Sequence, residues 1–278
     1  MDISILYYLA TGVLAGLLAG LFGIGGGLII VPALIYIFTT QNVPDAALTH
    51  ICIGTSLATI IVTSISSLRA HNTRGAVNWN VWKRMAPGLV IGSLIGAGVA
   101  SVIHGKPLQA VIGVGALLVG LKMLFMKNKG LEENDLSKLP STVVQTGLGG
   151  IIGMISAIFG IGGGTLTVPI LSHYGLKIQH AVGTSAACGL PIALSGAIGF
   201  LFFGQFVDVD VKEALPQGVF GFIHVYAFLC LSLASFFTAR VGAKLAHKLP
   251  AATLKKAFAI LMLVVGVKLA LSSQIFTI

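Results

Sequence analysis

The chain has 278 residues, of which 56% are hydrophobic and only 9% are charged. A soluble domain carries roughly 25% charged residues, so this composition excludes an ordinary water-soluble protein. The net charge of +9 does not indicate a nucleic-acid-binding protein, because the Lys and Arg residues gather in short loops between apolar stretches, as the positive-inside rule of membrane proteins requires.

The chain opens on residues 1–4 without a basic segment or a small-residue cleavage site, so we expect a first membrane element and not a signal peptide. Apolar spans then follow in both halves, at 3–38, 46–68, 85–103 and 107–126, and at 142–174, 178–203, 219–239 and 257–276. Helices that cross a bilayer need ~20 apolar residues. The sequence therefore predicts an all-α polytopic membrane protein.

Two blocks of the first half return in the second half. The block FGIGGG with a later proline spans Phe22–Gly27 and Pro32, and returns at Phe159–Gly164 and Pro169. Gly54-Thr55-Ser56 returns as Gly183-Thr184-Ser185, and a third pairing sets Pro87 against Pro216. We therefore expect two copies of one unit: a first transmembrane repeat at 1–126, a cytoplasmic linker at 127–140 and a second transmembrane repeat at 141–278.

The first span of each half contains the glycine block. Two full crossings of a bilayer need about 40 residues, more than either span offers. Three adjacent glycines also weaken a helix. We expect the block to break each span into two shorter helices that form a re-entrant hairpin.

The charges favour this hairpin model. If every span crossed once, Lys and Arg would divide almost evenly between the two sides. With re-entrant hairpins at 3–38 and 142–174, all of the 17 basic residues lie on one side except Lys106, Lys212 and Lys268. Each half then has a hairpin plus three crossings, so the halves insert with opposite orientation. The expected fold is two inverted repeats with both termini outside, an architecture that many secondary transporters share.

The duplicated glycine block, the duplicated GTS block and the loop from His71 to Trp79 resemble the sulfite exporter TauE/SafE family over the whole chain. Members of that family often carry Asp before this Trp, where this chain has Asn78. The resemblance implies an inner-membrane transporter of sulfur-containing anions such as sulfite, sulfonates or sulfoacetate, without specifying one of them.

The candidate binding site starts from the glycines. Irregular backbone inside a membrane persists only where protein or a watery cavity surrounds it, so backbone N–H groups and helix N-termini could face an anion there. The alternative is a tight turn that needs positive φ, and the two are compatible. We expect these residues to line the site: Gly25, Gly26, Gly27, Gly162, Gly163 and Gly164.

Four hydroxyl side chains beside the glycines extend this candidate site: Thr55, Ser56, Thr184 and Ser185. A buried anion needs several donors, which these hydroxyls could supply. The alternative is that they serve only close helix packing.

His50 and the aligned Gln179 complete the candidate set, His50 as a polar lining group or a proton-linked site. The alternative for His50 is an interfacial residue near a helix start. The spacings Gly12-Gly16-Gly20 and Gly88-Gly92-Gly96 indicate helix-packing faces. Pro191 predicts a kink, and Trp79 and Trp82 read as interfacial anchors.

These expectations combine into a secondary transporter, an exporter of a small sulfur-containing anion held at the midplane. An uptake permease or channel for thiosulfate, sulfate or another small organic anion is the alternative. We expect no enzyme, since the spans lack a carboxylate and a catalytic constellation, and no cofactor or metal, since the three cysteines have no ligand-like spacing. The expected partners are the anion and the lipid bilayer of a bacterial inner membrane, with no nucleic acid and a homodimer as a candidate assembly.

Overall fold

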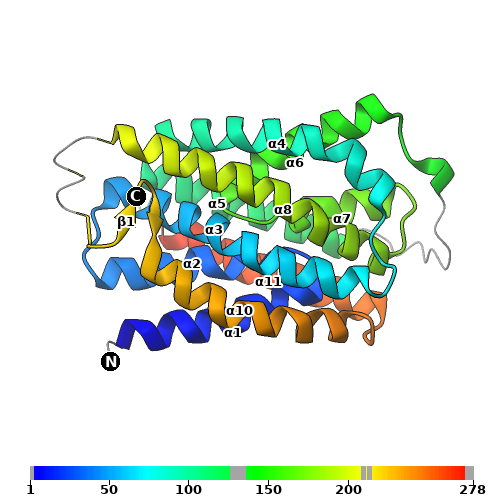
Figure 1. The fold of residues 1–278 in the computed structure, drawn as a ribbon, viewed down its shortest axis with the longest axis horizontal. Coiled ribbons are helices and arrows are strands. Elements are labelled where there is room, and N and C mark those ends of the chain that lie inside the picture. The colour runs from blue at the N-terminus through cyan, green and yellow to red at the C-terminus, as the bar shows by residue number, and fades with distance from the viewer. Residues whose placement is uncertain (1–2, 126–135, 208–210, 212–214, 273–278) are drawn as a thin grey trace.

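The computed structural model describes residues 3–125, 136–207, 211 and 215–272. Nearly all of its helices run along one common axis (Figure 1). The first half holds α1 (Ile3–Phe22), α2 (Gly27–Thr40), α3 (Asp45–Asn72), α4 (Trp79–Val102) and α5 (Gly105–Phe125). The second half holds η1 (Leu136–Lys138), α6 (Thr142–Phe159), α7 (Gly164–His173), α8 (Ile178–Phe203), η2 (Gly204–Phe206), β1 (Val219–Phe220), β2 (Ile223–His224), α10 (Val225–Ala246) and α11 (Ala251–Ser272).

Six helices of the described chain are long and apolar enough to cross a membrane: α1, α3, α4, α6, α8 (with η2) and α10. Their outward faces carry exposed Leu, Ile, Val and Phe side chains, as in Ile91, Ile151 and Phe237. Such faces suit lipid and would be costly in water. The predicted all-α polytopic membrane fold is confirmed.

The predicted helix breaks are also present. α1 ends at Phe22 and α2 begins at Gly27, while α6 ends at Phe159 and α7 begins at Gly164. The first pair forms a hairpin, because the amide of Gln41, just past α2, donates to the Ser4 hydroxyl in the first turn of α1 at 2.9 Å. With 20 residues, α1 is about 30 Å long. By its length it can nearly cross a bilayer.

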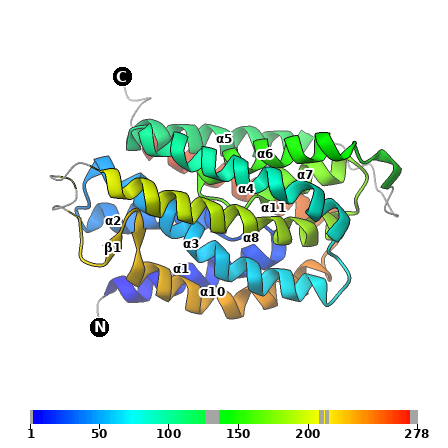
Figure 2. The ribbon, with the colours of Figure 1, turned by 45° about the horizontal axis from the view of Figure 1, so that its top comes forward.

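The helices pair between the halves. α1 packs along α10 and α4 packs along α6, with α3 and α8 between these two pairs (Figures 1 and 2). α3 and α8 run antiparallel, since Gly54 lies against Phe200 and Gly189 against Ser64. An inverted repeat predicts such pairing between the halves, so the pairing supports our proposal that the two halves are inverted repeats.

Glycines allow close helix–helix packing in the two outer pairs, α1–α10 and α4–α6. A Cβ at Gly12 would meet the Leu231 carbonyl oxygen on α10 at 2.7 Å. On the other pair, Gly88 and Gly92 lie against backbone atoms of Thr146 and Gly150 on α6. Both predicted glycine spacings are therefore helix-packing faces, as expected.

Two sequence interpretations need correction. Pro87 lies inside α4 whereas Pro216 precedes β1, so the two prolines are not equivalent. The apolar span at 219–239 is not one helix, because a β1–β2 hairpin precedes α10. Trp82, an expected interfacial anchor, also bonds within the bundle. Its indole N–H donates to the Ala187 carbonyl at 3.0 Å, which Pro191 leaves without its usual helical donor.

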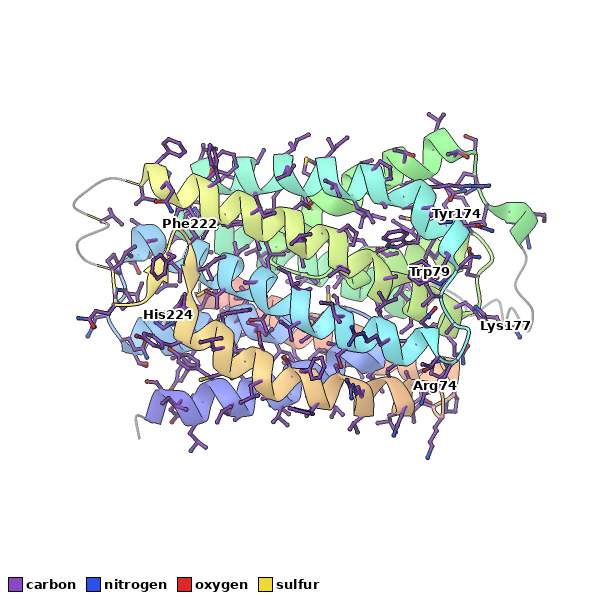
Figure 3. The ribbon with its side chains drawn as sticks, in the orientation of Figure 1. Arg74, Trp79, Tyr174, Lys177, Phe222 and His224 are labelled. Atoms are coloured by element: carbon purple, nitrogen blue, oxygen red, sulfur yellow. The ribbon has the colours of Figure 1, made fainter. Side chains whose placement is uncertain are left out.

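The two ends of the bundle allow a test of topology. Arg74 and Lys177 lie at one end and Phe222 and His224 toward the other (Figure 3). We expect single cysteines at Arg74 and Lys248, both exposed, to be labelled from the cytoplasmic side, and one at Lys106 from the opposite side. Labelling uses a membrane-impermeant maleimide in a background without the three native cysteines. Accessibility of positions 74 and 248 from opposite sides would contradict the inverted model. The expected periplasmic loop at Asp208 lies outside the described residues.

Candidate functional site

The two glycine turns meet inside the bundle. Gly26 and Gly163 are the residues before α2 and α7, with φ of 88° and 77°, a region that strongly favours glycine. The Gly162 N–H donates to the Ile24 carbonyl at 3.1 Å, and a Cβ on Gly25 would lie 3.1 Å from Cα of Gly162. The sequence prediction brought these turns together, and the described structure has them in direct backbone contact.

This contact explains why the blocks lack side chains. A Cβ on Gly27 would overlap the Gly160 carbonyl oxygen, and one on Gly164 would overlap that of Gly23. Each turn thus packs one of its carbonyl oxygens against the first residue of α2 or α7 in the other half. Backbone cannot move aside as a flexible side chain can, so both positions require glycine.

The GTS blocks hold these turns in place. Gly54 of α3 has no side chain, which leaves room for the Phe222 carbonyl oxygen. Gly183 of α8 leaves room in the same way for the Ala76 carbonyl oxygen, which lies 2.5 Å from the place where a Cβ on residue 183 would be. The Ser56 hydroxyl donates to Gly160 O and the Ser185 hydroxyl to Gly23 O, each at 2.8 Å. The two serines therefore tie each half to the glycine turn of the other.

Thr55 and Thr184 fix the segments that lead into α10 and α4. The Thr55 hydroxyl oxygen accepts the His224 N–H, and that of Thr184 accepts the Asn78 N–H, each at 2.9 Å. His224 and Asn78 in turn cap their helices, because each side chain accepts the N–H three residues on at 3.1 Å. Sequence reasoning missed this equivalence of Asn78 and His224, since the two residues differ in type and precede helices that share no motif.

His50 and Gln179 lie apart from the turns. His50 is buried near the start of α3, where its Nε2 faces the carbonyls of Ala100 and Ile103 at 3.1 and 3.0 Å. Its ring stacks on Phe222 at 5.0 Å between centroids. Gln179 is partly exposed in the first turn of α8. The antiparallel course of α3 and α8 carries the two residues to opposite ends of the bundle.

Other hydroxyls around the turns have no partner. The described structure leaves Ser64, Ser156 and Thr167 buried, at 0–1% exposure, with their hydroxyls unbonded. Ser156 and Thr167 flank Gly163, with their oxygens 3.8 and 3.6 Å from the Cβ that Gly163 lacks. The first half has Ala19 and Ile30 at the matching positions. A residue-by-residue comparison of the repeats could have identified this asymmetry.

A histidine pair closes the end of α3 near Arg74. His71 Nε2 lies 2.9 Å from the Gly20 carbonyl, and its Nδ1 lies 3.1 Å from His247 Nε2. In the neutral pair, His71 Nε2–H donates to Gly20 and His247 Nε2–H donates to His71. Burial lowers the pKa of His247, and the neighbouring Arg74 and His180 lower it further. Among the described residues, no group of three or more His, Cys, Asp or Glu could hold a metal ion.

Comparison with known proteins gives one coherent family. The family model described as "Sulfite exporter TauE/SafE" matches residues 8–269. A "Probable membrane transporter protein" of Haemophilus influenzae is 36% identical over 267 residues, covering 95% of this chain and 97% of its own. A similarly named Bacillus subtilis protein, YdhB, is 27% identical over 262 residues, covering 92% and 96%, and a Methanocaldococcus jannaschii protein is 25% identical, covering 86% and 85%. No solved structure matches the chain.

Proposed function

The chain belongs to the sulfite exporter TauE/SafE family and is a membrane transporter, and from this premise we propose that it exports a small sulfur-containing anion, such as sulfite or an organosulfonate, across the bacterial inner membrane. The anion binds where the two glycine turns meet. It crosses as the cargo of a secondary carrier, with the halves acting as inverted repeats.

The observation that carries this proposal is the pair of helix starts at the turns. α2 and α7 both begin at the glycine blocks, at Gly27 and Gly164. The N-terminus of a helix carries a partial positive charge and unpaired N–H groups, which bind anions. In several transporters, broken helices aim such ends at anionic substrates near the midplane.

The charges of the described residues also favour an anion. No Asp, Glu, Lys or Arg is among the buried residues of the described chain. A cation would find no buried carboxylate to replace its water, whereas an anion can be met by N–H and O–H donors. The membrane potential, negative inside, favours anion exit and supports the export direction.

In this proposal the glycines Gly25–Gly27 and Gly162–Gly164 shape the site. Ser56, Ser185, Thr55 and Thr184 act on it by holding the turns, since their oxygens bond to backbone in the described structure. His50 and Gln179 would lie outside the anion site, where they would line the anion's paths from the glycine turns toward the two ends of the bundle. These roles are narrower than the direct anion contacts expected from the sequence.

The test is flux in proteoliposomes. We expect the purified chain to move radiolabelled sulfite or a small sulfonate, faster when a potassium gradient with valinomycin makes the anion-loaded side negative. Metal cations and free amines should not move. Cation transport without anion flux would overturn the proposal. Flux only of thiosulfate or sulfate, or flux only toward the inside, would replace the exporter by the alternative permease.

A further inference from the structure

Six hydroxyls of the described residues are buried without a hydrogen-bond partner, and two of them, on Ser156 and Thr167, lie beside the same glycine. Serine and threonine in its helices mostly donate to a carbonyl three or four residues back, as Ser93 and Thr59 do at 2.8 and 2.9 Å. The hydroxyls of Ser156 and Thr167 make no such bond, although both residues are almost fully buried. A buried hydroxyl without a partner costs about 1–3 kcal/mol, and two such groups beside one helix start are available to donate to a ligand.

The two hydroxyls lie at the start of α7, beside the same glycine. Both oxygens are within 4 Å of the position where Gly163 lacks its Cβ. The first two N–H groups of α7, on Gly164 and Thr165, have no acceptor within their own helix, because the carbonyls four residues back precede it; the first bonds of the helix run from the N–H groups of Leu166 and Thr167 to the Gly163 carbonyl. Hydroxyl and N–H donors thus gather at the positive end of a ten-residue helix.

The space where Gly163 lacks a Cβ is filled by a side chain, whereas the corresponding space at Gly26 is filled by backbone. The nearest atom to the missing Cβ of Gly163 is Cδ1 of Ile192, at 2.5 Å, while that of Gly26 is the Ala15 carbonyl oxygen, at 2.8 Å. The end of an isoleucine side chain can rotate away, but a helical carbonyl cannot. Only the second turn can therefore open without moving a helix.

The matching positions of the first half are apolar. Ala19 stands where Ser156 stands, and Leu28 and Ile30 stand where Thr165 and Thr167 stand. The two turns have similar backbone conformations but differ in the hydroxyl donors beside them. A symmetric site spread over both turns would not need this difference.

Resting on the proposed transport function, we propose that the anion binds on one side only, at the start of α7, where Ser156 and Thr167 donate to a singly charged oxyanion. Dipoles alone neutralise the charge, since the described residues bury no Lys or Arg. The desolvation cost of an ion rises steeply with its charge. The site therefore selects monoanions, such as bisulfite or a sulfonate, over dianions such as sulfate.

The experiment measures melting temperature and flux for the wild type and the double variant Ser156→Ala/Thr167→Val. Without anion, the double variant should melt no lower than the wild type, because it removes hydroxyls that have no partner. Methanesulfonate and sulfite should raise the melting temperature of the wild type by mass action. The double variant should lose this rise, and its concentration for half-maximal flux should increase at least ~10-fold.

Two controls separate binding from packing. Ser156→Ala/Thr167→Ser returns one hydroxyl to the double variant and should recover part of the anion stabilisation that the double variant loses. Ser232→Ala removes another buried, unbonded hydroxyl, on α10, and should leave flux and anion stabilisation unchanged.

The outcomes distinguish the two proposals. If no anion stabilises or crosses with the wild type, the proposed function fails and this inference fails with it. If the wild type responds and the double variant responds equally, the function stands, the hydroxyls hold only a buried water and this inference is wrong. Sulfate acting as strongly as methanesulfonate on the wild type would overturn the monoanion selectivity.

Discussion

Gly27→Ala and Gly164→Ala should each abolish the folded protein. The single added methyl group would overlap the Gly160 carbonyl in the first variant and the Gly23 carbonyl in the second. The Cβ of Gly164 would also lie 2.5 Å from Cα of Ile24. Overpacking of a core typically costs 1–3 kcal/mol, and more where backbone must move. Because each overlap lies between the two halves, relief requires their separation.

The measurement is the yield of monodisperse protein after detergent extraction, with the melting temperature of whatever is recovered. Gly147→Ala is the matched control, because Gly147 is an exposed helical glycine of α6 with no atom within 4 Å of its Cβ position. This control should melt at or above the wild-type temperature, since alanine is the better helix former by ~1 kcal/mol. A normal yield and melting temperature for Gly27→Ala would show that the turns do not interlock as described.

Much of this architecture follows from local sequence physics. A glycine block inside a long apolar span cannot continue a helix, so the breaks after Phe22 and Phe159 could be predicted. The duplication of the block predicted that its two copies would share one location. The spacing of Gly12, Gly16 and Gly20 predicted a close helix partner, since three glycines four residues apart form one smooth face.

The partners of those elements could not be predicted. Nothing in the glycine spacing says that α1 packs on α10 of the other half and not on a neighbour in sequence. The GTS block suggested anion donors, yet its serines bond to carbonyls of the opposite turn. These bonds depend on how the halves interlock, which is a tertiary property. The β1–β2 hairpin before α10 could not be predicted for the same reason.

The symmetric threonines lead to the last prediction, in which Thr55→Val should destabilise the protein more than Thr184→Val. Valine keeps the shape of threonine but cannot accept a hydrogen bond. In Thr55→Val the His224 N–H loses its acceptor, and His224 is only 6% exposed, so no water can easily replace it. We expect a loss of ~1–3 kcal/mol. Asn78, the partner of Thr184, is partly exposed, and water there should limit the loss to under about 1 kcal/mol.

The control for both variants is Thr59→Val, on the same helix as Thr55 and as fully buried as Thr55 and Thr184. The Thr59 hydroxyl donates to the Thr55 carbonyl of its own helix, and a helical carbonyl of this kind keeps its backbone donor when the hydroxyl is removed. Thr59→Val should therefore melt close to the wild type. Thr55→Ser retains the acceptor and should recover most of the stability lost in Thr55→Val. Equal melting temperatures for Thr55→Val and Thr59→Val would show that the His224 N–H does not depend on Thr55, and the threonine would then be a packing residue.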